Sequence, residues 1–481
     1  MTVRPDGASY EGRPHPLDLM VSALEQAAKD AGSTRRVLDT LEEITAVGSF
    51  TWHTSDPALL VAQRLGLHDV ATKLTGVGGN VPQHLVHDAA RRILAGQITT
   101  VAVVGAEAMY ARLLATREGR DVDWVVQGDD VVGVGVESSD PAPLSAAEFA
   151  QGLTFPTSVY PIFENARRAR LGWSMHEQRD RLGRLWANFA SVAANNPYAW
   201  MTGAPSPHAI ATPDASNRMV AFPYTKLLVS NMPVDMGAAL IITNYEHARS
   251  LGVERASMVF PQFGVEANDH WLISDRPSLD DSPAMRAIWR ELQTYGVDLD
   301  ALGHLDLYSC FPTAVQSACD ALGIDAFDPT RIPTVTGGLT FAGGPGNNYV
   351  THSIASMVEA LRADPSSQGL VSALGYFCTK HAWGTYAPSP PRDGFRWASA
   401  QASVDRLPRV VAEQRNGAVT VESYTVTHGR DGAPERLLGV ARTSDQVRVW
   451  CHSTDAQLLV DVETTELIGR TALVRDGVLL L

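Results

Sequence analysis

The sequence lacks several features that would assign a chemistry at once. Its 481 residues include four cysteines, Cys310, Cys319, Cys378 and Cys451, and none has CxxC or Cys/His ligand spacing. HExxH and GxSxG motifs are absent, and no apolar run approaches the roughly 18 residues that a membrane span needs. We therefore expect reduced thiols, no metal site and no membrane-spanning segment.

Positive charge is scarce as well. The chain has 39 lysines and arginines against 53 aspartates and glutamates, which gives a formal net charge of −14. This balance argues against nucleic acids and anionic membrane surfaces as partners. The first 16 residues contain no apolar segment of the kind found in signal peptides, so we expect a cytoplasmic protein.

What the sequence does contain is an alternation of helix and strand patterns, in a chain long enough for two to four domains. Amphipathic periodicity predicts helices over residues 15–32, 57–66 and 82–96, and apolar runs predict strands over residues 44–47 and 100–104. The second of these runs, TVAVV, is typical of a strand buried on both faces. Together the elements predict an α/β protein.

The same order of elements recurs later in the chain. Helices are predicted over residues 285–296 and 312–323, with a strand over residues 304–308. Glycine-rich segments follow at corresponding places, TGVGGNVPQ in the first half and TGGLTFAGGPGNN in the second. A chain built from two similar halves usually has its site between them, where corresponding loops converge.

Two regions fall outside this repeat. Residues 110–222 lack the repeated order and contain an aromatic-rich helix, which indicates an inserted subdomain over the site. After the Pro/Gly-rich segment PSPPRDG, a small β-barrel or sandwich is predicted. Its strands are expected over residues 419–428, 437–443, 447–452 and 472–481, with one helix over residues 456–467.

Two glycine-rich turns precede corresponding helices. Gly78, Gly79 and Asn80 come before Pro82, and residues 343–348 come before the matching helix. Asparagine is a good N-cap and proline suits the first helical turn, so free backbone N–H groups are expected to face one cavity and to suit an anion or oxyanion. Tight turns that require glycine are the alternative. Neither turn has a nucleotide-binding fingerprint, which argues against NAD and ATP.

Several longer motifs point to a family. GGNVPQ with GAEAM, FPYTKLLVSNMPVDMGAA, HLDLYSCFPTAVQ, TGGLTFAGGPGNNYVTH and TKHAWGTY resemble the thiolase superfamily, most closely the actinobacterial thiolase-like proteins of type 1. The resemblance covers residues 15–390 and implies an α/β thiolase fold, in which two duplicated halves form five αβαβα layers with an inserted loop domain. The tail resembles the OB-type accessory domain that accompanies such proteins.

The resemblance also implies domain boundaries. The N-terminal thiolase half is expected over residues 1–110 and 223–252, with the loop subdomain inserted over residues 111–222. The C-terminal thiolase half is expected over residues 253–395, and the OB-like β domain over residues 396–481.

The departures from the family pattern bear directly on activity. The position of the nucleophilic cysteine falls on Gly79, that of the activating histidine on Gly344, and that of the acid/base cysteine on Leu374 or Gly375. Glycine supplies neither a thiolate nor a base, so the usual thiolase reaction is not expected. Family members also open with an apolar strand that MTVRPDGASYEGRP does not contain, so a sheet edge should be incomplete or covered differently.

The remaining polar residues of the motifs are the candidates for chemistry. Tyr308, Cys310 and His381 are the candidate acid/base residues. Each also has a structural interpretation, as a hydrogen-bonded buried tyrosine, a small buried apolar residue and a satisfied histidine. The candidate substrate-binding and oxyanion residues are Gly79, Asn80, His84, Gly343, Gly344, Asn347, Asn348 and Gly375. Of these, Asn347 and Asn348 are expected mainly to cap a helix.

Two functions stay open at this stage. The first is an enzyme that forms or cleaves a C–C bond of an acyl-CoA or related thioester through an enolate, with coenzyme A present only as part of the substrate and no other cofactor. The second is a non-catalytic acyl-CoA or lipid-binding protein, or a scaffold that recruits a partner enzyme through its C-terminal domain. The resemblance is also compatible with a homodimer, because thiolase-fold proteins commonly dimerise beside the first half.

Overall fold

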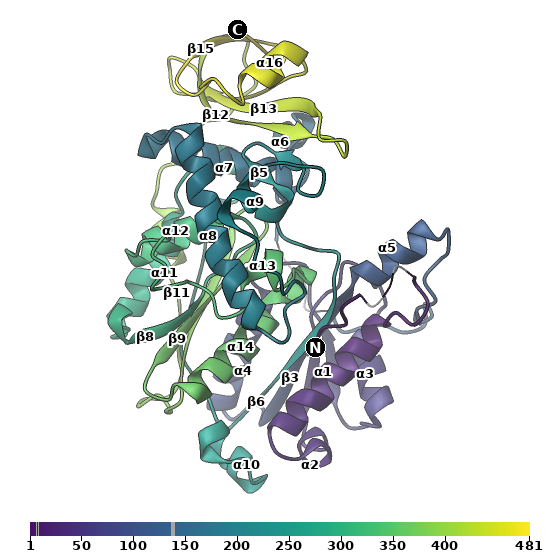
Figure 1. The fold of residues 1–481 in the computed structure, drawn as a ribbon. Helices are drawn as coiled ribbons and strands as arrows, with labels where there is room; N and C mark the ends of the chain where they lie inside the picture. The colour runs from purple at the N-terminus through teal and green to yellow at the C-terminus, as the bar shows by residue number, and fades with distance from the viewer. Residues whose placement is uncertain (6, 8, 136–139) are drawn as a thin grey trace.

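The computed structural model describes residues 1–5, 7, 9–135 and 140–481. Two sheets are separated by the central helices α4 (Val81–Leu94) and α14 (Tyr349–Ala363). Helices α1 (Pro16–Asp30) and α3 (Pro57–Leu65) cover the outer face of the first sheet, and α11 (Pro283–Thr294) and α12 (Pro312–Leu322) lie outside the second (Figure 1). The expected five αβαβα layers are therefore confirmed.

The first sheet has the order β2-β1-β3-β6. Its strands are β2 (Ala71–Leu74), β1 (Glu43–Ala46), β3 (Thr100–Ala108) and β6 (Asp235–Thr243). The first three run parallel and β6 runs antiparallel to β3. Every residue of β3 is buried, because helices cover both faces of the strand, as its unbroken apolar run predicts.

The second sheet has the order β8-β9-β10-β7-β11, in which β8-β9-β10 repeat the order and directions of β1-β3-β6. The strands are β8 (Leu302–Asp306), β9 (Gln368–Gly375), β10 (Lys380–Ala387), β7 (Phe260–Asn268) and β11 (Arg396–Ser399). The expected duplication is thus present. Because β11 pairs with β7, residues 396–399 belong to this half, and the expected boundary after residue 395 lies four residues too early.

The two halves differ at one sheet edge. In the second half, β7 pairs along the whole of β10, whereas residues 1–3 alone lie beside the start of β6. Thr2 forms a single antiparallel bridge with Met236, and Gly237 donates its N–H to the carbonyl of Met1. Beyond Gly237, none of the described residues pairs with this edge of β6.

Local sequence signals explain where the helices start. Helices α1, α3 and α11 each begin at a proline that follows a polar N-cap residue, His15, Asp56 and Ser282 respectively. Each of these side chains accepts a hydrogen bond from a backbone N–H of the first turn. For this reason the predicted and observed helix starts agree within two residues.

The inserted region covers the junction of the halves mainly with helices. It contains α5 (Met109–Arg117), α6 (Ala146–Ala150), α7 (Pro156–Leu171), α8 (Met175–Asn195), α9 (Pro207–Ala211), β4 (Met219–Ala221) and β5 (Tyr224–Thr225). Shorter helices elsewhere are α2 (Thr34–Leu38), α10 (Tyr245–Ser250), α13 (Gly338–Phe341) and α15 (Gln401–Asp405). None of the helices in the described part of the chain has the length and apolarity that a membrane span requires.

The C-terminal region is a small β domain. Strands β12 (Gly417–His428), β13 (Pro434–Arg442), β14 (Arg448–Ser453), β16 (Val478–Leu480) and β15 (Thr471–Arg475) pair in this order, and pairing of β15 with β12 closes the ring. The domain has one helix, α16 (Ala456–Asp461). The segment expected as one strand over 472–481 forms two strands, because the chain turns at Asp476 and Gly477, both at positive φ.

A buried arginine fixes this domain to the thiolase-fold body. The guanidinium of Arg448 donates to both carboxylate oxygens of Glu422, at 2.7 and 2.9 Å. It also donates to the carbonyls of Ile273, Ser274 and Arg276, at 2.7 to 3.2 Å. Since one fully buried cation satisfies acceptors of both parts, the two parts are held in one arrangement.

Replacing Arg448 tests this attachment. We expect Arg448→Leu to destabilise the protein by about 3 kcal/mol, because it leaves buried carbonyls and part of a carboxylate without donors. The measurement is urea unfolding followed by circular dichroism. Arg415→Leu, which removes an exposed arginine of the same domain, is the control and should leave the midpoint unchanged. Equal midpoints for the two variants would contradict the assignment.

Candidate functional site

The two glycine-rich turns meet where the halves join. The Asn347 side-chain oxygen accepts from the Gly78 N–H at 2.9 Å, and its amide donates to the Gly48 carbonyl at 2.8 Å. The Asn348 amide donates to the carbonyl of Gly105 at 2.7 Å. The expectation that both asparagines cap a helix is wrong, since their amide groups bond across to the first half and Asn348 makes no side-chain cap bond to α14.

The position expected for the nucleophile is filled by another side chain. A Cβ atom on Gly79 would overlap the phenol oxygen of Tyr308 and would lie 2.8 Å from its Cζ and 2.5 Å from the Leu374 carbonyl oxygen. Tyr308 follows β8 of the second half, and Gly79 precedes α4 of the first. Glycine at position 79 and tyrosine at position 308 are therefore sterically matched across the junction.

A similar match occurs at the position of the second cysteine. A Cβ atom on Gly375 would overlap the side-chain oxygen of Asn80. Asn80 is buried, its side chain does not cap α4 as expected, and this oxygen has no hydrogen-bond partner among the described residues. Asn80 and Gly375 therefore lie together at the junction, with one polar atom available to a ligand.

Tyr308 is a neutral phenol in this setting. The residue is 8% exposed, and burial raises the pKa of Tyr308 far above its ordinary value of about 10. Its backbone N–H donates to Ser372 Oγ at 2.9 Å, and its ring packs edge-to-face against Tyr349, with centroids 5.6 Å apart. A phenol of this kind can donate a hydrogen bond but does not serve as a base near neutral pH.

None of the four cysteines is a thiolate near neutral pH. Burial raises the pKa of Cys310 to about 12, against a hydrogen bond from Tyr160 that lowers it. Burial also raises the pKa of Cys451 to about 12, and those of Cys319 and Cys378 still further. Cys310 thus lies close to Tyr308 in the chain but has the properties of a packed, protonated thiol.

His381 lies away from this cluster. It is opposite Leu374 in the β9–β10 pairing, whereas Lys380 is opposite Gly375. Because side chains alternate along a strand, His381 points to the outer helical layer, where its Nε2 lies 3.1 Å from Asp269. Asp269 in turn accepts the N–H of Ala284 near the start of α11. We therefore leave His381 out of the proposed site.

His84 lies on the flank of α4, facing β7. Its Nδ1 is 3.0 Å from Glu266, which also lies 2.7 Å from the buried His87. Burial by itself would raise the pKa of Glu266, but hydrogen bonds from the two histidines hold it well below its usual range. The hydrogen bond to Glu266 raises the pKa of His84. His84 is therefore part of an ion-pair cluster beside the junction.

The backbone N–H groups of the turns are only partly available. Gly78 donates to Asn347, and Gly344 donates to the Asn231 carbonyl at 2.9 Å. Within the described residues, no acceptor is recorded for the N–H groups of Gly79 and Asn80, which therefore remain as oxyanion donors.

The remaining glycine of the second turn has a steric role. Gly343 adopts a positive φ of 116°, and a Cβ atom there would come within 2.5 Å of the Met236 sulfur. Its place in the turn is thus fixed by close packing.

The loop after Gly375 has unusual backbone geometry. Tyr376 and Cys378 have φ values of 56° and 54°, in the left-handed region that residues with a Cβ seldom adopt. Their conformation is supported by Tyr160, whose hydroxyl accepts from the Cys378 N–H at 2.9 Å and donates to the Tyr376 carbonyl at 3.1 Å. Strain of this kind is often found in loops that hold functional groups.

Two buried carboxylates that the sequence analysis did not select organise the site. Glu107, near the end of β3, accepts from the backbone N–H groups of Phe50 and Thr51, and burial raises its pKa. Asp306, at the end of β8, accepts from the backbone N–H groups of Val335 and Thr336. The acidic residues within GAEAM and HLDLY, each near the end of a strand, were the signal that could have identified them.

Comparisons with known proteins agree with this description. Residues 400–477 match the family model described as the thiolase-like protein type 1 additional C-terminal domain. The chain is similar to a crystal structure described as a monomeric SCP2-thiolase like protein type 1 from Mycobacterium smegmatis, with 29% identity and a TM-score of 0.84. That match covers 100% of this chain and 97% of the other. No curated protein matches.

Two more distant structures share the fold. One is described as an Ltp2-ChsH2(DUF35) aldolase, with 19% identity, a TM-score of 0.57, and coverage of 78% of this chain and 94% of that one. The other is an acetyl-CoA acetyltransferase from Syntrophomonas wolfei, with 15% identity, a TM-score of 0.55, and coverage of 81% and 96%. At these identities the likeness concerns the fold alone.

The fit between Tyr308 and Gly79 can be tested by a double-mutant cycle. We expect Gly79→Cys alone to destabilise the protein by about 2 kcal/mol through overpacking. Tyr308→Ala should cost about 3 kcal/mol through the cavity it leaves. The double variant should be more stable than the sum of the two costs by at least about 1 kcal/mol, because the cavity accepts the new side chain. Urea unfolding of all four proteins measures this, and additive costs would refute the contact.

The His84–Glu266 pair predicts a pH dependence of stability. The lowered pKa of Glu266 stabilises the fold above the unfolded value of about 4.3, and the raised pKa of His84 stabilises it below about 6.5. Both contributions are complete only between these values. The stability difference between the wild type and Glu266→Gln should therefore be largest at pH 4.3–6.5, and should shrink as Glu266 protonates at lower pH or His84 deprotonates at higher pH. Thermal unfolding across pH measures it, and a difference that does not vary with pH would be inconsistent with this pair.

Proposed function

Because this chain is a thiolase-like protein of type 1, and its nucleophile position is closed by Tyr308, we propose that it binds an acyl thioester such as an acyl-CoA without covalent catalysis. The observation that carries this proposal is the steric match of Tyr308 to Gly79. A thiolase reaction requires an acyl group to be transferred to a thiolate. At this position there is neither a thiol nor room for one.

The other cysteines do not compensate for this loss. All four thiols have raised pKa values because they are buried, so the thiolate population near neutral pH is negligible. His381 is paired with Asp269 on the outer face of the second sheet and does not reach the junction. A covalent acyl-enzyme intermediate therefore has no support in this geometry.

Features that suit thioester binding are retained. The N–H groups of Gly79 and Asn80 lie at the start of α4, where the helix dipole favours a partially negative oxygen. The side-chain oxygen of Asn80 is buried without a partner among the described residues. We infer that the thioester carbonyl accepts from these N–H groups, with the Tyr308 hydroxyl as a further donor.

A second candidate function rests on the position of Tyr308. Its hydroxyl lies beside the Gly79 backbone, where it could donate a proton or hydrogen bond to an enolate oxygen during C–C bond cleavage or formation. The strained backbone at Tyr376 and Cys378 favours a functional loop at this place. The raised pKa of Tyr308 makes it a hydrogen-bond donor in such a reaction, and not the base.

We propose that the protein is a monomer. The backbone N–H of Leu74 on β2 donates to the Val134 carbonyl at 3.0 Å, and Leu74 forms a bridge with Gly135. These residues cover the outer edge of the first sheet, so a homodimer through this edge is not favoured. The C-terminal barrel, which we take to be of OB type, is proposed to bind a partner enzyme.

A panel of acyl-CoAs tests the two functions. The protein is incubated with saturated, β-hydroxy and β-keto acyl-CoAs, binding is measured by isothermal titration calorimetry, and products and protein mass are followed by mass spectrometry. We expect binding without a change in ligand or protein mass, and weaker binding by about threefold to tenfold for Tyr308→Phe, which removes one hydrogen bond. Cys451→Ser, in the distant barrel, is the matched control.

The outcomes separate the candidates. Turnover that Tyr308→Phe abolishes would replace the binding function by the C–C bond chemistry. An acyl adduct on the protein would overturn both. Failure of every acyl-CoA to bind would overturn the proposed ligand class.

A further inference from the structure

The amide oxygen of Asn80 is a buried hydrogen-bond acceptor at the start of α4. Asn80 is 7% exposed, and its Oδ1 has no hydrogen-bond partner among the described residues. Leaving such an atom unpaired costs free energy, so a ligand that supplies a donor here gains affinity. The backbone N–H groups of Gly79 and Asn80 lie beside it, at the N-terminus of this helix of 14 residues.

The backbone conformation of Asn80 explains where its side chain lies. A residue whose side chain caps a helix N-terminus usually has extended φ and ψ values, whereas those of Asn80 are helical, at −78° and −16°. The side chain therefore does not turn back to the N–H groups of the first turn. Its Oδ1 lies between Gly78 and Gly375, since a Cβ atom on Gly78 would be 2.6 Å from it and one on Gly375 would overlap it.

The polar groups at this place differ in kind. In the proposed function, the N–H groups of Gly79 and Asn80 and the hydroxyl of Tyr308 donate to the thioester carbonyl. The Oδ1 of Asn80 has the opposite requirement, because an amide oxygen only accepts hydrogen bonds. A thioester carbonyl therefore satisfies the donors and leaves this acceptor unpaired, unless the acyl group carries a donor of its own.

A hydroxyl group on the acyl chain meets this requirement. The donor N–H and the acceptor Oδ1 belong to the same residue, so the two groups of the ligand that pair with them must lie close together. In a 3-hydroxyacyl thioester one carbon atom separates the carbonyl carbon from the carbon that carries the hydroxyl, and both oxygens can face Asn80. A saturated acyl chain has no donor there, and a 3-ketoacyl chain in its keto form presents a second acceptor.

We propose that the ligand of this site is a 3-hydroxyacyl thioester whose hydroxyl group donates a hydrogen bond to Asn80 Oδ1. This inference rests on the proposed thioester function and names the class of acyl group that the same site selects. Asn80 thereby determines specificity. A site that hydrogen-bonds a hydroxyl group discriminates strongly against an analogue without it, because the buried polar atom is then left unpaired.

The thiol part of an acyl-CoA offers a competing donor. Its nearest amide N–H is separated from the sulfur by two carbon atoms, which places the nitrogen one bond further from the carbonyl carbon than a 3-hydroxyl oxygen. The shorter connection favours the hydroxyl group, because donor and acceptor lie on one residue. The two donors also differ in what they predict, since the amide is common to every acyl-CoA and the hydroxyl group is not.

A set of acyl-CoAs that differ only at C3 tests the inference on the full-length protein. The probes are butyryl-CoA, the two enantiomers of 3-hydroxybutyryl-CoA and acetoacetyl-CoA, and binding is measured by isothermal titration calorimetry. We expect one enantiomer of 3-hydroxybutyryl-CoA to bind about tenfold more tightly than butyryl-CoA, because it adds one hydrogen bond to a buried acceptor. Acetoacetyl-CoA should bind no more tightly than butyryl-CoA.

Variants of the acceptor separate the hydroxyl group from the rest of the ligand. Asn80→Ala removes the oxygen and should abolish the preference for the hydroxyl group, whereas Asn80→Asp keeps an acceptor in the same place and should retain it. Gly375→Ala puts a Cβ atom where Oδ1 lies and should also reduce the preference. Circular dichroism establishes that each variant is folded, and the comparison of ligands on the wild type keeps the test valid if a variant does not fold.

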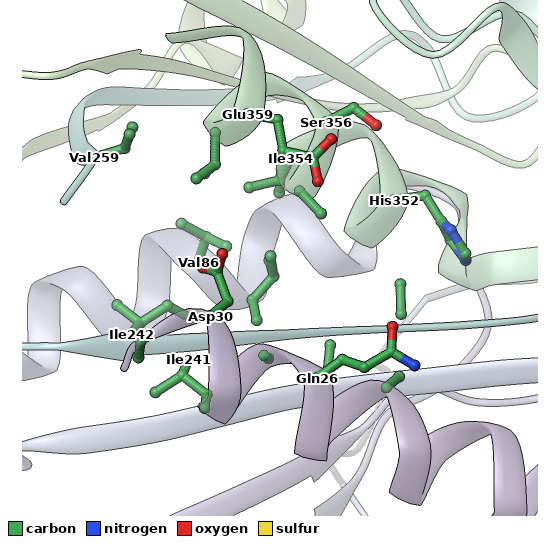
Figure 2. A pocket seen from close by; sticks show the side chains of 18 of the residues that line it. Gln26, Asp30, Val86, Ile241, Ile242, Val259, His352, Ile354, Ser356 and Glu359 are labelled. Carbon is green, nitrogen blue, oxygen red and sulfur yellow. The ribbon is translucent and has the colours of Figure 1, made fainter. Parts of the chain in front are cut away.

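A pocket beside β6 supplies the matched control. Figure 2 shows this pocket with Gln26 of α1, Ile241 of β6 and Glu359 of α14 among the residues that line it. Gln26→Ala also removes a side-chain amide, but at a different cavity. It should leave the affinities for all four probes unchanged.

The inference and the proposed function fail in different ways. Equal binding of butyryl-CoA and both 3-hydroxybutyryl-CoA enantiomers, or a preference that Asn80→Ala leaves intact, would overturn the inference, while acyl-CoA binding itself would still support the proposed function. An equal loss of affinity for all probes in Asn80→Ala would overturn it by assigning Oδ1 to the amide of the thiol part. Loss of the preference in Gln26→Ala would place the hydroxyl group in the pocket beside β6 instead. Failure of every probe to bind would overturn the proposed function as well.

Discussion

The packing of Tyr308 against Gly79 is the contact on which the proposed function of this protein depends. A residue at position 79 with a side chain would meet both the phenol ring and the carbonyl of Leu374. The steric match joins the two halves where a thiolase would hold its nucleophile, and Asn80 against Gly375 repeats the arrangement at the second cysteine position. The space that a side chain at position 79 would need is thus taken by Tyr308, and the polar groups left are donors and one amide oxygen.

The junction is held in place by polar contacts between the halves. Asn347 and Asn348 bond to the backbone of Gly48, Gly78 and Gly105, which fixes the second glycine-rich turn against the first half. These bonds are buried, so breaking one leaves a donor or acceptor without compensation. Such contacts hold the two glycine-rich turns in one arrangement, which agrees with the proposed binding of one carbonyl group.

The duplicated architecture also explains why one edge of the molecule differs from its counterpart. Where β7 completes the second sheet, the first sheet has residues 1–3 alone at β6. The C-terminal domain is attached to the thiolase-fold body by hydrogen bonds from Arg448 to backbone carbonyls.

Much of the fold could be read from local sequence. The proline and polar cap residue at the start of α1 and α3 predicted where these helices begin. The run TVAVV predicted a strand covered on both faces, and the repeated order of elements predicted two halves. The end of the second half was placed too early because β11 is recognisable only through its pairing with β7. The caps expected at Asn80 and Asn348 were wrong, because the Asn348 amide bonds to the distant Gly105 carbonyl and the Asn80 side chain lies against Gly375 without capping α4.

The sequence by itself determined that the residues of thiolase catalysis are absent, because glycine at positions 79 and 344 excludes a thiolate and a base whatever the fold. Only the tertiary structure decided what replaces them. Tyr308 lies 229 positions beyond Gly79 in the chain, and no local pattern indicates that its ring fills the space at Gly79. His381 is close in sequence to the Gly375 loop but lies outside the site, because side chains alternate between the two faces of a strand. Local composition fixes which groups exist, whereas long-range packing fixes which of them meet.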